Sequence, residues 1–267
     1  TLEAGFGFGH VDVGRCGAEL SPAETSNNCT SFGVFSRVVN RTSFNFGITQ
    51  ILGKATTGAL VFDIGLESGD QSKPYRYVPM FSPDAAAQAP LGAPFAWVTA
   101  NRLPERPLEQ TPLSKRRIAA TARLAHRFDG STLRLEERLY ADTWENKSTT
   151  TDLRWLIDAS SRLTLGPHVR YHLQSGTNFF KRVYRAQLAP QIVLPNFRTT
   201  DRELGPMWGI TGGASAYWRL SAEKEEASLS WMLYASGDGL FDFYTDSLYI
   251  KSRQAVYGTI GVEAVFE

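Results

Sequence analysis

A chain of 267 residues is long enough for one large β domain or for two ordinary domains. Its net charge of +1 argues against nucleic acid as a partner, because a nucleic-acid-binding domain carries a basic stripe. No run approaches the ~18 consecutive apolar residues of a membrane-spanning helix, so a helical membrane protein is excluded.

Strands are predicted wherever apolar residues occupy every second position. Such a pattern opens the chain at residues 2–8 with no signal peptide before it, so we expect a mature or truncated product, and strands before Thr1 can be missing. Residues 43–52 and 60–66 alternate around a short turn, which predicts a hairpin. Residues 69–114 hold eight of the thirteen prolines and cannot form a central strand.

A second hairpin is predicted around Asp129 and Gly130, because Asp-Gly between two alternating runs is the strongest short hairpin signal. Residues 177–206 form a second long irregular segment. The same alternation predicts the remaining strands at residues 118–124, 133–141, 153–159, 169–173, 208–220, 227–235 and 254–266.

The last strand, Gln254 to Phe266, has apolar residues or glycine at every even position from Val256 onward. It ends in an aromatic residue and looks like the closing strand of a bacterial outer-membrane β-barrel. In that resemblance the terminal aromatic residue belongs to the signal that the barrel-insertion machinery reads, although here Glu267 follows it. The alternative is an amphipathic edge strand of a soluble sandwich.

The connections between the predicted strands alternate in length. Short turns on one side and long loops on the other are typical of an outer-membrane barrel, whereas a soluble sandwich scatters its loop lengths over both ends. The short turns lie at residues 53–56, 129–130, 160–166 and 221–226, and the long or polar segments at residues 14–40, 69–114, 177–206 and 237–253.

These patterns predict an all-β fold in the bacterial outer membrane. We expect one transmembrane antiparallel up-and-down β-barrel domain over residues 1–267, with short periplasmic turns and long extracellular loops. About ten strands are visible in the sequence, and ten to twelve are expected.

Alternate positions of each strand separate a lipid-facing side from a lumen-facing side. The lipid-facing side includes Leu60, Phe62, Ile64, Trp155, Ile157, Leu229, Trp231, Ile260 and Val262, with Trp208 and Trp218 added as parts of an aromatic girdle. The lumen side carries the charge network Asp63, Glu67, Arg117, Arg123, Arg127, Arg134, Glu136, Arg138, Asp142, Asp152, Arg154, Asp158, His168, Arg170, His172, Arg219 and Glu263. Glu137 falls on the lipid-facing side and indicates a bulge or an error of register.

Arginines that interleave with carboxylates across strands form salt-bridged networks. At about ten strands the interior is scarcely wider than that of an eight-stranded barrel, which side chains alone can fill. We therefore expect these networks to plug the lumen. A selectivity filter or a substrate channel is the alternative interpretation of the same charges.

The two cysteines, Cys16 and Cys29, lie in a polar stretch, and we predict that they form a disulfide in an extracellular loop. His168 and His172 share a strand but lie more than ~13 Å apart along it, too far to share a metal ion or a proton. No nucleophile elbow, zinc motif or phosphate loop is present in the sequence. We therefore expect no enzyme activity, no metal site and no cofactor.

Several short strings resemble an uncharacterised family of proteobacterial outer-membrane β-barrel proteins, DUF3570. The strings are Lys73-Pro74-Tyr75-Arg76, Leu103-Pro104-Glu105-Arg106, Tyr140 through Trp144, Arg170-Tyr171-His172 with Gln174-Ser175, and Thr245 through Tyr249. Their order and spacing over residues 42–266 carry the resemblance. It implies an outer-membrane barrel without an established activity. Genes of the family often stand beside those for flavin-transferring and thioredoxin-like proteins, which implies a redox-associated system.

From these observations we expect a membrane anchor or scaffold, or a binding partner in a larger assembly. Outer-membrane lipid is expected to surround the barrel. Segment 69–114 is too long to be merely a connector, and its aromatic residues can pack over the mouth of the barrel or contact another protein. The alternatives are a small-solute or ion channel and, after it, an enzyme at the rim.

Overall fold

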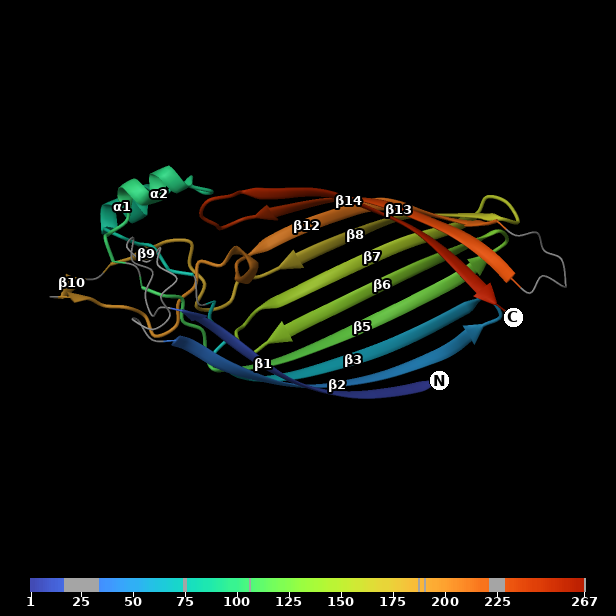
Figure 1. The fold of residues 1–267 in the computed structure, drawn as a ribbon, viewed down its shortest axis with the longest axis horizontal. Coiled ribbons are helices and arrows are strands. Elements are labelled where there is room, and N and C mark those ends of the chain that lie inside the picture. Colours follow the sequence, from blue (N-terminus) through green and yellow to red (C-terminus); the bar gives the residue numbers. More distant parts are fainter. Residues whose placement is uncertain are drawn as a thin grey trace.

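The computed structural model describes residues 1–16, 34–73, 76–105, 107–186, 188–189, 191–220 and 229–266. One antiparallel sheet of ten strands dominates these residues, and each strand pairs with the next long strand of the chain (Figure 1). The strands are β1 (Leu2–Cys16), β2 (Val34–Gly53), β3 (Thr56–Gly69), β5 (Ser114–Phe128), β6 (Ser131–Asp142), β7 (Lys147–Asp158), β8 (Leu163–Gln174), β12 (Met207–Arg219), β13 (Leu229–Tyr244) and β14 (Ser252–Phe266).

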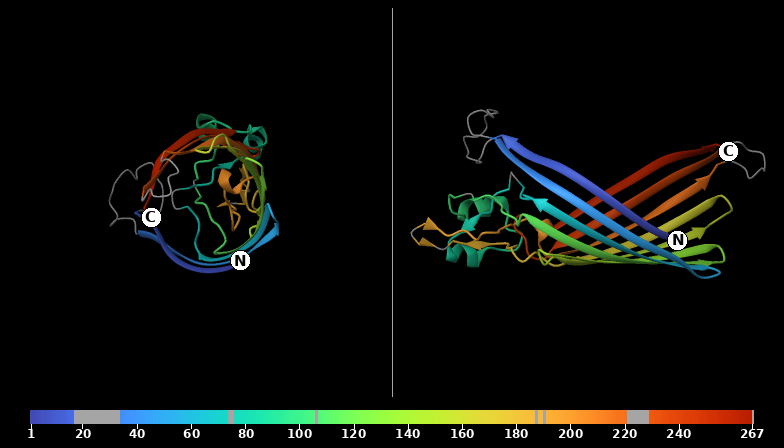
Figure 2. Two further views of the ribbon diagram at one scale, coloured as in Figure 1. Left: turned by 90° about the vertical axis from the view of Figure 1, so that its right-hand side faces the viewer. Right: turned by 90° about the horizontal axis from the view of Figure 1, so that it is seen from below.

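The sheet curls around a hollow when it is viewed end-on (Figure 2, left). Its edges are β1 and β14, and no pairing joins these two strands among the described residues. The all-β class, the ten antiparallel strands and their up-and-down order are therefore confirmed, with the ring open between β1 and β14.

The hairpin turns lie where the sequence places them. β2 turns into β3 at residues 54–55, and Gly130 has φ +74° in the turn between β5 and β6. A left-handed φ of this kind favours glycine, because a Cβ atom would clash with the backbone. The short turns gather at one end of the sheet and the long connections at the other, and both chain termini lie at the short-turn end (Figure 1).

Three strands are longer than the sequence suggests. β13 continues through Tyr244, so the predicted long loop at 237–253 shrinks to residues 245–251. Its Gly237 and Gly239 resemble loop residues, but both glycines pair with β12 on one side and with β14 on the other, which satisfies their backbone hydrogen bonds within the sheet. β1 and β2 likewise extend into the predicted loop at 14–40.

Three connections fold together into a unit beyond the long-loop end of the sheet, which we call the cap (residues 70–113, 175–206 and 245–251). It contains β4 (Met80–Phe81), α1 (Pro83–Gln88), α2 (Phe95–Asn101), β9 (Tyr184–Arg185), β10 (Leu188–Ala189), β11 (Gln191–Ile192) and the 3-10 turn η1 (Arg202–Leu204). β4 pairs in parallel with β9, which joins the first two connections. No helix in the described part of the chain is long and apolar enough to cross a membrane.

The apolar core of the protein lies mainly in the cap. Phe81, Val98 and Leu248 are buried in one cluster, and Met80 packs with Tyr184 in a second. Ser82 caps α1 by accepting a hydrogen bond from the Ala85 amide. The ten-stranded sheet instead turns its apolar side chains outward.

That outer surface is a continuous apolar belt. Cross-strand rows such as Phe46, Phe62 and Ala120 connect neighbouring strands, and Phe46 keeps half of its surface exposed. Tryptophans stand near both ends of the belt: Trp218 lies one residue before the short-turn end of β12, and Trp208 stacks on Phe243 at 4.2 Å near the cap. The belt has the composition that a bilayer requires.

Of three further sequence predictions, the structure decides one and leaves two open. The β5–β6 register shows no shift, so Glu137 lies on the outer side by plain alternation, and the bulge suggested for it is absent. Cys29 and the side chains of Cys16 and Leu229 lie outside the described residues, so the disulfide and the position of the Leu229 side chain stay predictions.

Candidate functional site

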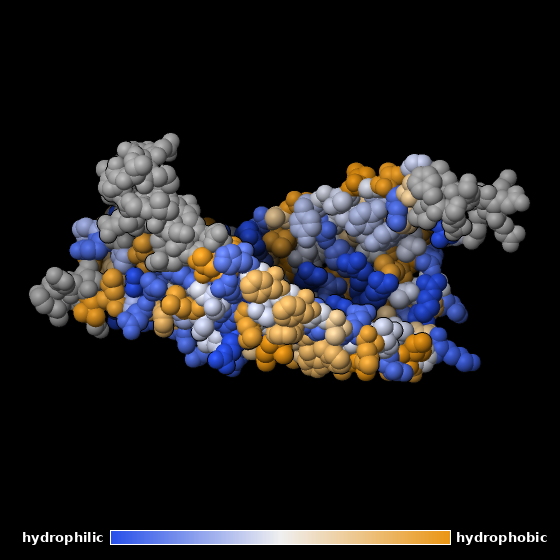
Figure 3. All heavy atoms as spheres, turned by 60° about the horizontal axis from the view of Figure 1, so that its bottom comes forward, coloured by the Kyte–Doolittle hydropathy of each residue, from blue (hydrophilic) through white to orange (hydrophobic). Residues whose placement is uncertain are grey.

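Charged side chains line the inside of the curled sheet. Figure 3 shows hydrophilic residues inside the hollow, above a hydrophobic band of outer surface. Opposite charges on neighbouring strands stabilise a sheet. The arginines of β5, β6 and β8 make three pairs of this kind, and Arg138 and Arg127 each reach a carboxylate across one intervening strand. Together these ion pairs are Arg117–Glu67 (3.4 Å), Arg138–Asp63 (3.0 Å), Arg123–Glu136 (2.6 Å), Arg127–Asp158 (2.5 Å) and Arg170–Asp152 (3.0 Å).

Further pairs lie near the cap. Lys115 contacts the buried carboxylate of Asp142 at 3.1 Å, and Arg253 contacts Asp242 at 2.5 Å. Sequence reasoning missed Asp242 because it falls in the segment predicted as a loop. The signal that could have identified Asp238 and Asp242 is their spacing of four, which places both on the same face of an extended strand.

His168 and Asp238 meet across the glycine of an intervening strand. Gly213 pairs with both residues, and His168 Nε2 lies 2.6 Å from Asp238 Oδ1. A Cβ atom on Gly213 would lie 2.4 Å from that oxygen, so glycine is required for the close approach. His172 has a different partner, the Thr150 hydroxyl at 2.8 Å. The two predicted lumen histidines therefore do not share a site.

The ion pairs do not fill the interior. Arg123 and Arg170 each keep 55% of their side-chain surface exposed. A cavity of about 520 Å³ extends along β2, β3 and β5 to β8, and a second one of about 350 Å³ lies beside Asp63 and Arg138. The predicted plug of salt-bridged side chains is thus not formed by the described residues, because long arginines can pair along the wall without reaching across the hollow.

Arg134 and Arg154 differ from the expected interleaving of opposite charges. The β6–β7 register places them directly opposite each other, and no ion pair among the described residues includes either one. Of the remaining predicted residues, Arg219 ends β12 and Glu263 lies on the edge strand β14.

The cap contains a charge cluster that sequence reasoning did not identify, formed by Lys73, Arg76, Glu109, Asp201 and Glu203. The carboxylates of Glu109 and Asp201 are almost fully buried. Lys73 Nζ lies 2.6 Å from Asp201 Oδ2, Arg76 contacts the same oxygen, and the Lys73 amide donates to Glu109 at 2.8 Å. The cluster ties Lys73, Arg76 and Glu109 to the second long connection, so it joins two segments of the cap.

Burial and charge set the ionisation of the groups in and around this cluster. Burial lowers the pKa of Arg76 and raises that of Tyr184 to about 12. Partial burial of Glu203 acts to raise the pKa of its carboxyl, but Lys73 and the neighbouring arginines outweigh it, so this pKa lies below its usual value. At neutral pH Glu203 is therefore a carboxylate, and Tyr184 is a neutral hydroxyl.

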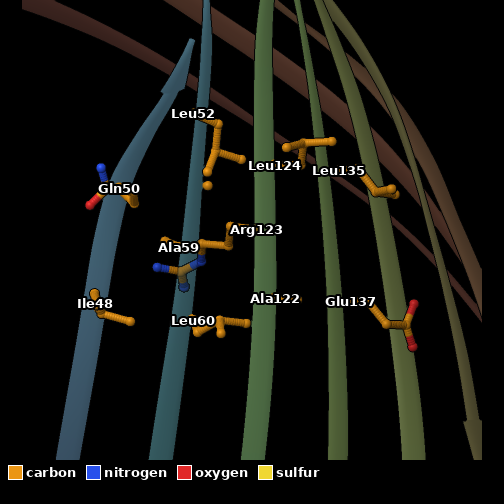
Figure 4. Close-up of a pocket in the computed structure, with 11 residues that line it drawn as sticks. Ile48, Gln50, Leu52, Ala59, Leu60, Ala122, Arg123, Leu124, Leu135 and Glu137 are labelled. Carbon is orange, nitrogen blue, oxygen red and sulfur yellow. The ribbon is translucent and has the colours of Figure 1, made fainter.

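A shallow groove of about 480 Å³ crosses the outer face of β2, β3, β5 and β6. Figure 4 shows its apolar walls, Leu60, Leu124 and Leu135, with Glu137 at one side. The Glu137 carboxylate accepts hydrogen bonds from Thr151 Oγ1 at 2.5 Å and from Thr149 Oγ1. These donors reduce the cost of a carboxylate on an apolar surface.

Within the described ranges, no three His, Cys, Asp or Glu side chains gather closely enough to hold a metal ion. Most of the charged groups instead pair with each other. No histidine, carboxylate and nucleophile of these sites form a hydrogen-bonded triad in the described interior.

Comparison with known proteins identifies a family and several similar solved structures. A family model described as a protein of unknown function, DUF3570, matches residues 33–238. No curated protein matches. A solved structure described as a bacterial polysaccharide outer membrane secretin is similar with a TM-score of 0.40 and 8% sequence identity, over 87% of this chain and 72% of that chain.

Proposed function

The chain belongs to the DUF3570 family, and we propose that it is a bacterial outer-membrane β-barrel that anchors a folded extracellular cap, which serves as a binding platform for a partner. Outer-membrane lipid surrounds the belt of apolar side chains. The observation that carries this proposal is the outward-facing apolar belt over ten strands, combined with a polar interior.

A membrane location requires that the edges of β1 and β14 find partners. Unpaired backbone N–H and C=O groups cost several kcal/mol each in hydrocarbon. With ten strands in up-and-down order, β1 and β14 run antiparallel, so they can pair with each other or through additional strands. The C-terminal strand Gln254 to Phe266 is also the segment that we propose the barrel-insertion machinery reads.

The cap supports a scaffold role better than a wide pore. Loops of the cap lie inside the outline of the sheet in the end-on view (Figure 2, left). The cap has its own apolar clusters and its own ion pairs, so it is a folded body rather than a set of connectors. Phe95, with 65% of its surface exposed, and Phe197 are aromatic side chains that it offers to a partner.

Surface labelling tests the location and the orientation together. In a chain whose Cys16 and Cys29 are replaced by serine, we introduce Phe95→Cys in the cap or Lys54→Cys in a short turn. Phe95→Cys should react with a membrane-impermeant maleimide on intact cells, and Lys54→Cys only after the outer membrane is permeabilised. Equal labelling of both on intact cells, or recovery of the protein in the soluble fraction, would contradict the proposal.

The second candidate function is an ion or small-solute channel, which the half-exposed lumen arginines and the lumen cavities favour. A planar-bilayer recording distinguishes the two candidates. The anchor function predicts no conductance steps from the intact chain, because the cap covers one mouth. Stable steps from the intact chain would favour the channel.

A further inference from the structure

We propose that Arg134 and Arg154 bind a soluble phosphate-like oxyanion in the lumen, in the half nearer the short turns. This site goes beyond the anchor function and does not depend on it. A phosphate group carries about 1.5 to 2 negative charges at neutral pH, which is the charge that these two side chains can neutralise together.

The positions of the two arginines are unfavourable unless an anion lies between them. They face each other directly across β6 and β7 on the lumen side, and like charges directly opposite each other destabilise a sheet. The nearest carboxylates on the same face of these strands already form ion pairs with other arginines. Glu136 pairs with Arg123 at 2.6 Å, and Asp152 pairs with Arg170 at 3.0 Å.

The charges around the cavity of about 520 Å³ do not balance. Four arginines and two carboxylates line it, which leaves two positive charges, and the ion pairs assign this surplus to Arg134 and Arg154. Guanidinium groups match the oxygens of phosphate with two parallel hydrogen bonds each. The cavity therefore combines surplus charge with the donor geometry that oxyanions prefer.

The surroundings add further polar groups and enough space. Thr49 and Thr57 line the same cavity. On the other side of Arg154 stands His168, its partner across the strand pair, whose Nδ1 is buried without a hydrogen-bond partner among the described residues. The volume lies within the range of about 300–1,000 Å³ typical of small-molecule sites, so a phosphate attached to a small organic group also fits.

The test is calorimetric titration of the detergent-solubilised chain with inorganic phosphate at an ionic strength of about 0.15 M, for the unaltered protein and for Arg134→Gln and Arg154→Gln. Each substitution should weaken phosphate binding about tenfold or more, because it removes charge-assisted hydrogen bonds. Arg138→Gln is the matched control on the same strand and face, and its Asp63 partner is known. It should change the affinity by less than about threefold, since screening limits its effect at a distance.

A denaturant titration without phosphate separates ligand binding from a structural role. Arg154→Gln should then be at least as stable as the unaltered chain, because it removes a like-charge contact, and phosphate should stabilise only the unaltered chain. The proposal fails if the unaltered chain binds no phosphate, if Arg138→Gln weakens binding as much as Arg154→Gln, or if Arg154→Gln is clearly destabilised without phosphate. Binding of short-chain phosphatidic acid without binding of inorganic phosphate would overturn the assignment to a soluble solute.

Discussion

Replacing Asp201 by alanine is expected to open the cap while leaving the ten-stranded sheet folded. The Asp201 side chain is 3% exposed and contacts both Lys73 and Arg76, and it also accepts a hydrogen bond from the Glu203 amide at the start of η1. Removing one partner of a buried ion pair costs about 3–5 kcal/mol, because the remaining charge is left uncompensated. Lys73 is half exposed, so we expect the lower end of this range.

Hydrogen exchange measures this effect segment by segment. Amides around residues 73–111 and 199–205 should lose protection in Asp201→Ala, whereas amides of β6 and β7 should keep theirs. Glu203→Ala is the matched control, because Glu203 bonds the same lysine but its side chain is 57% exposed. Glu203→Ala should change the free energy of opening of the cap, as measured by hydrogen exchange, by less than about 1 kcal/mol. Equal effects of the two substitutions would show that burial does not set the strength of this cluster.

A second large loss of stability is expected when a charge is placed on the outer face of the sheet. Phe46 lies near the middle of the apolar belt, between Ala4 and Phe62 on the neighbouring strands. Phe46→Arg should lower the free energy of unfolding in phospholipid vesicles by about 2–4 kcal/mol, the cost of an arginine at the bilayer midplane. Urea unfolding of the vesicle-inserted protein gives the value directly.

The neighbouring residue supplies the control for Phe46→Arg. Asn45 points into the lumen and pairs with Asp63, so an arginine there meets water and a carboxylate. Asn45→Arg should cost less than about 1 kcal/mol, because lumen substitutions avoid the hydrocarbon. Similar costs at positions 45 and 46 would mean that the two faces of β2 have the same surroundings, which is incompatible with a membrane barrel.

The sequence predicts the strands, their order and their two faces because period-two alternation records the surroundings of every second side chain. Glu137 is a charged residue at a position that alternation assigns to the apolar outer face, and its side chain does lie on that face. Hydrogen bonds from Thr149 and Thr151 explain why a carboxylate is tolerated there. The extent of β13 was missed because Gly237 and Gly239 are typical of loops, and only pairing on both sides shows them to be strand residues.

Partners across strands are harder to predict than faces, because they depend on register. Ala141 pairs with Lys147, which centres the β6–β7 hairpin on residue 144 and sets Arg134 opposite Arg154. A different turn length would have given Arg134 another partner, so alternation alone cannot find this pair. The cap cluster was missed for a related reason. Lys73 and Asp201 are 128 residues apart, and no local pattern connects them.

The most direct test of the membrane barrel is a spin-label accessibility scan of β3 in phospholipid vesicles. Labels at Leu60, Phe62 and Ile64 should collide mainly with oxygen, which concentrates in hydrocarbon, and labels at Val61, Asp63 and Gly65 mainly with a water-soluble nickel complex. The two accessibilities should alternate out of phase along the strand. Equal access of the nickel complex to both sets of positions would contradict a lipid-facing belt and, with it, the outer-membrane barrel.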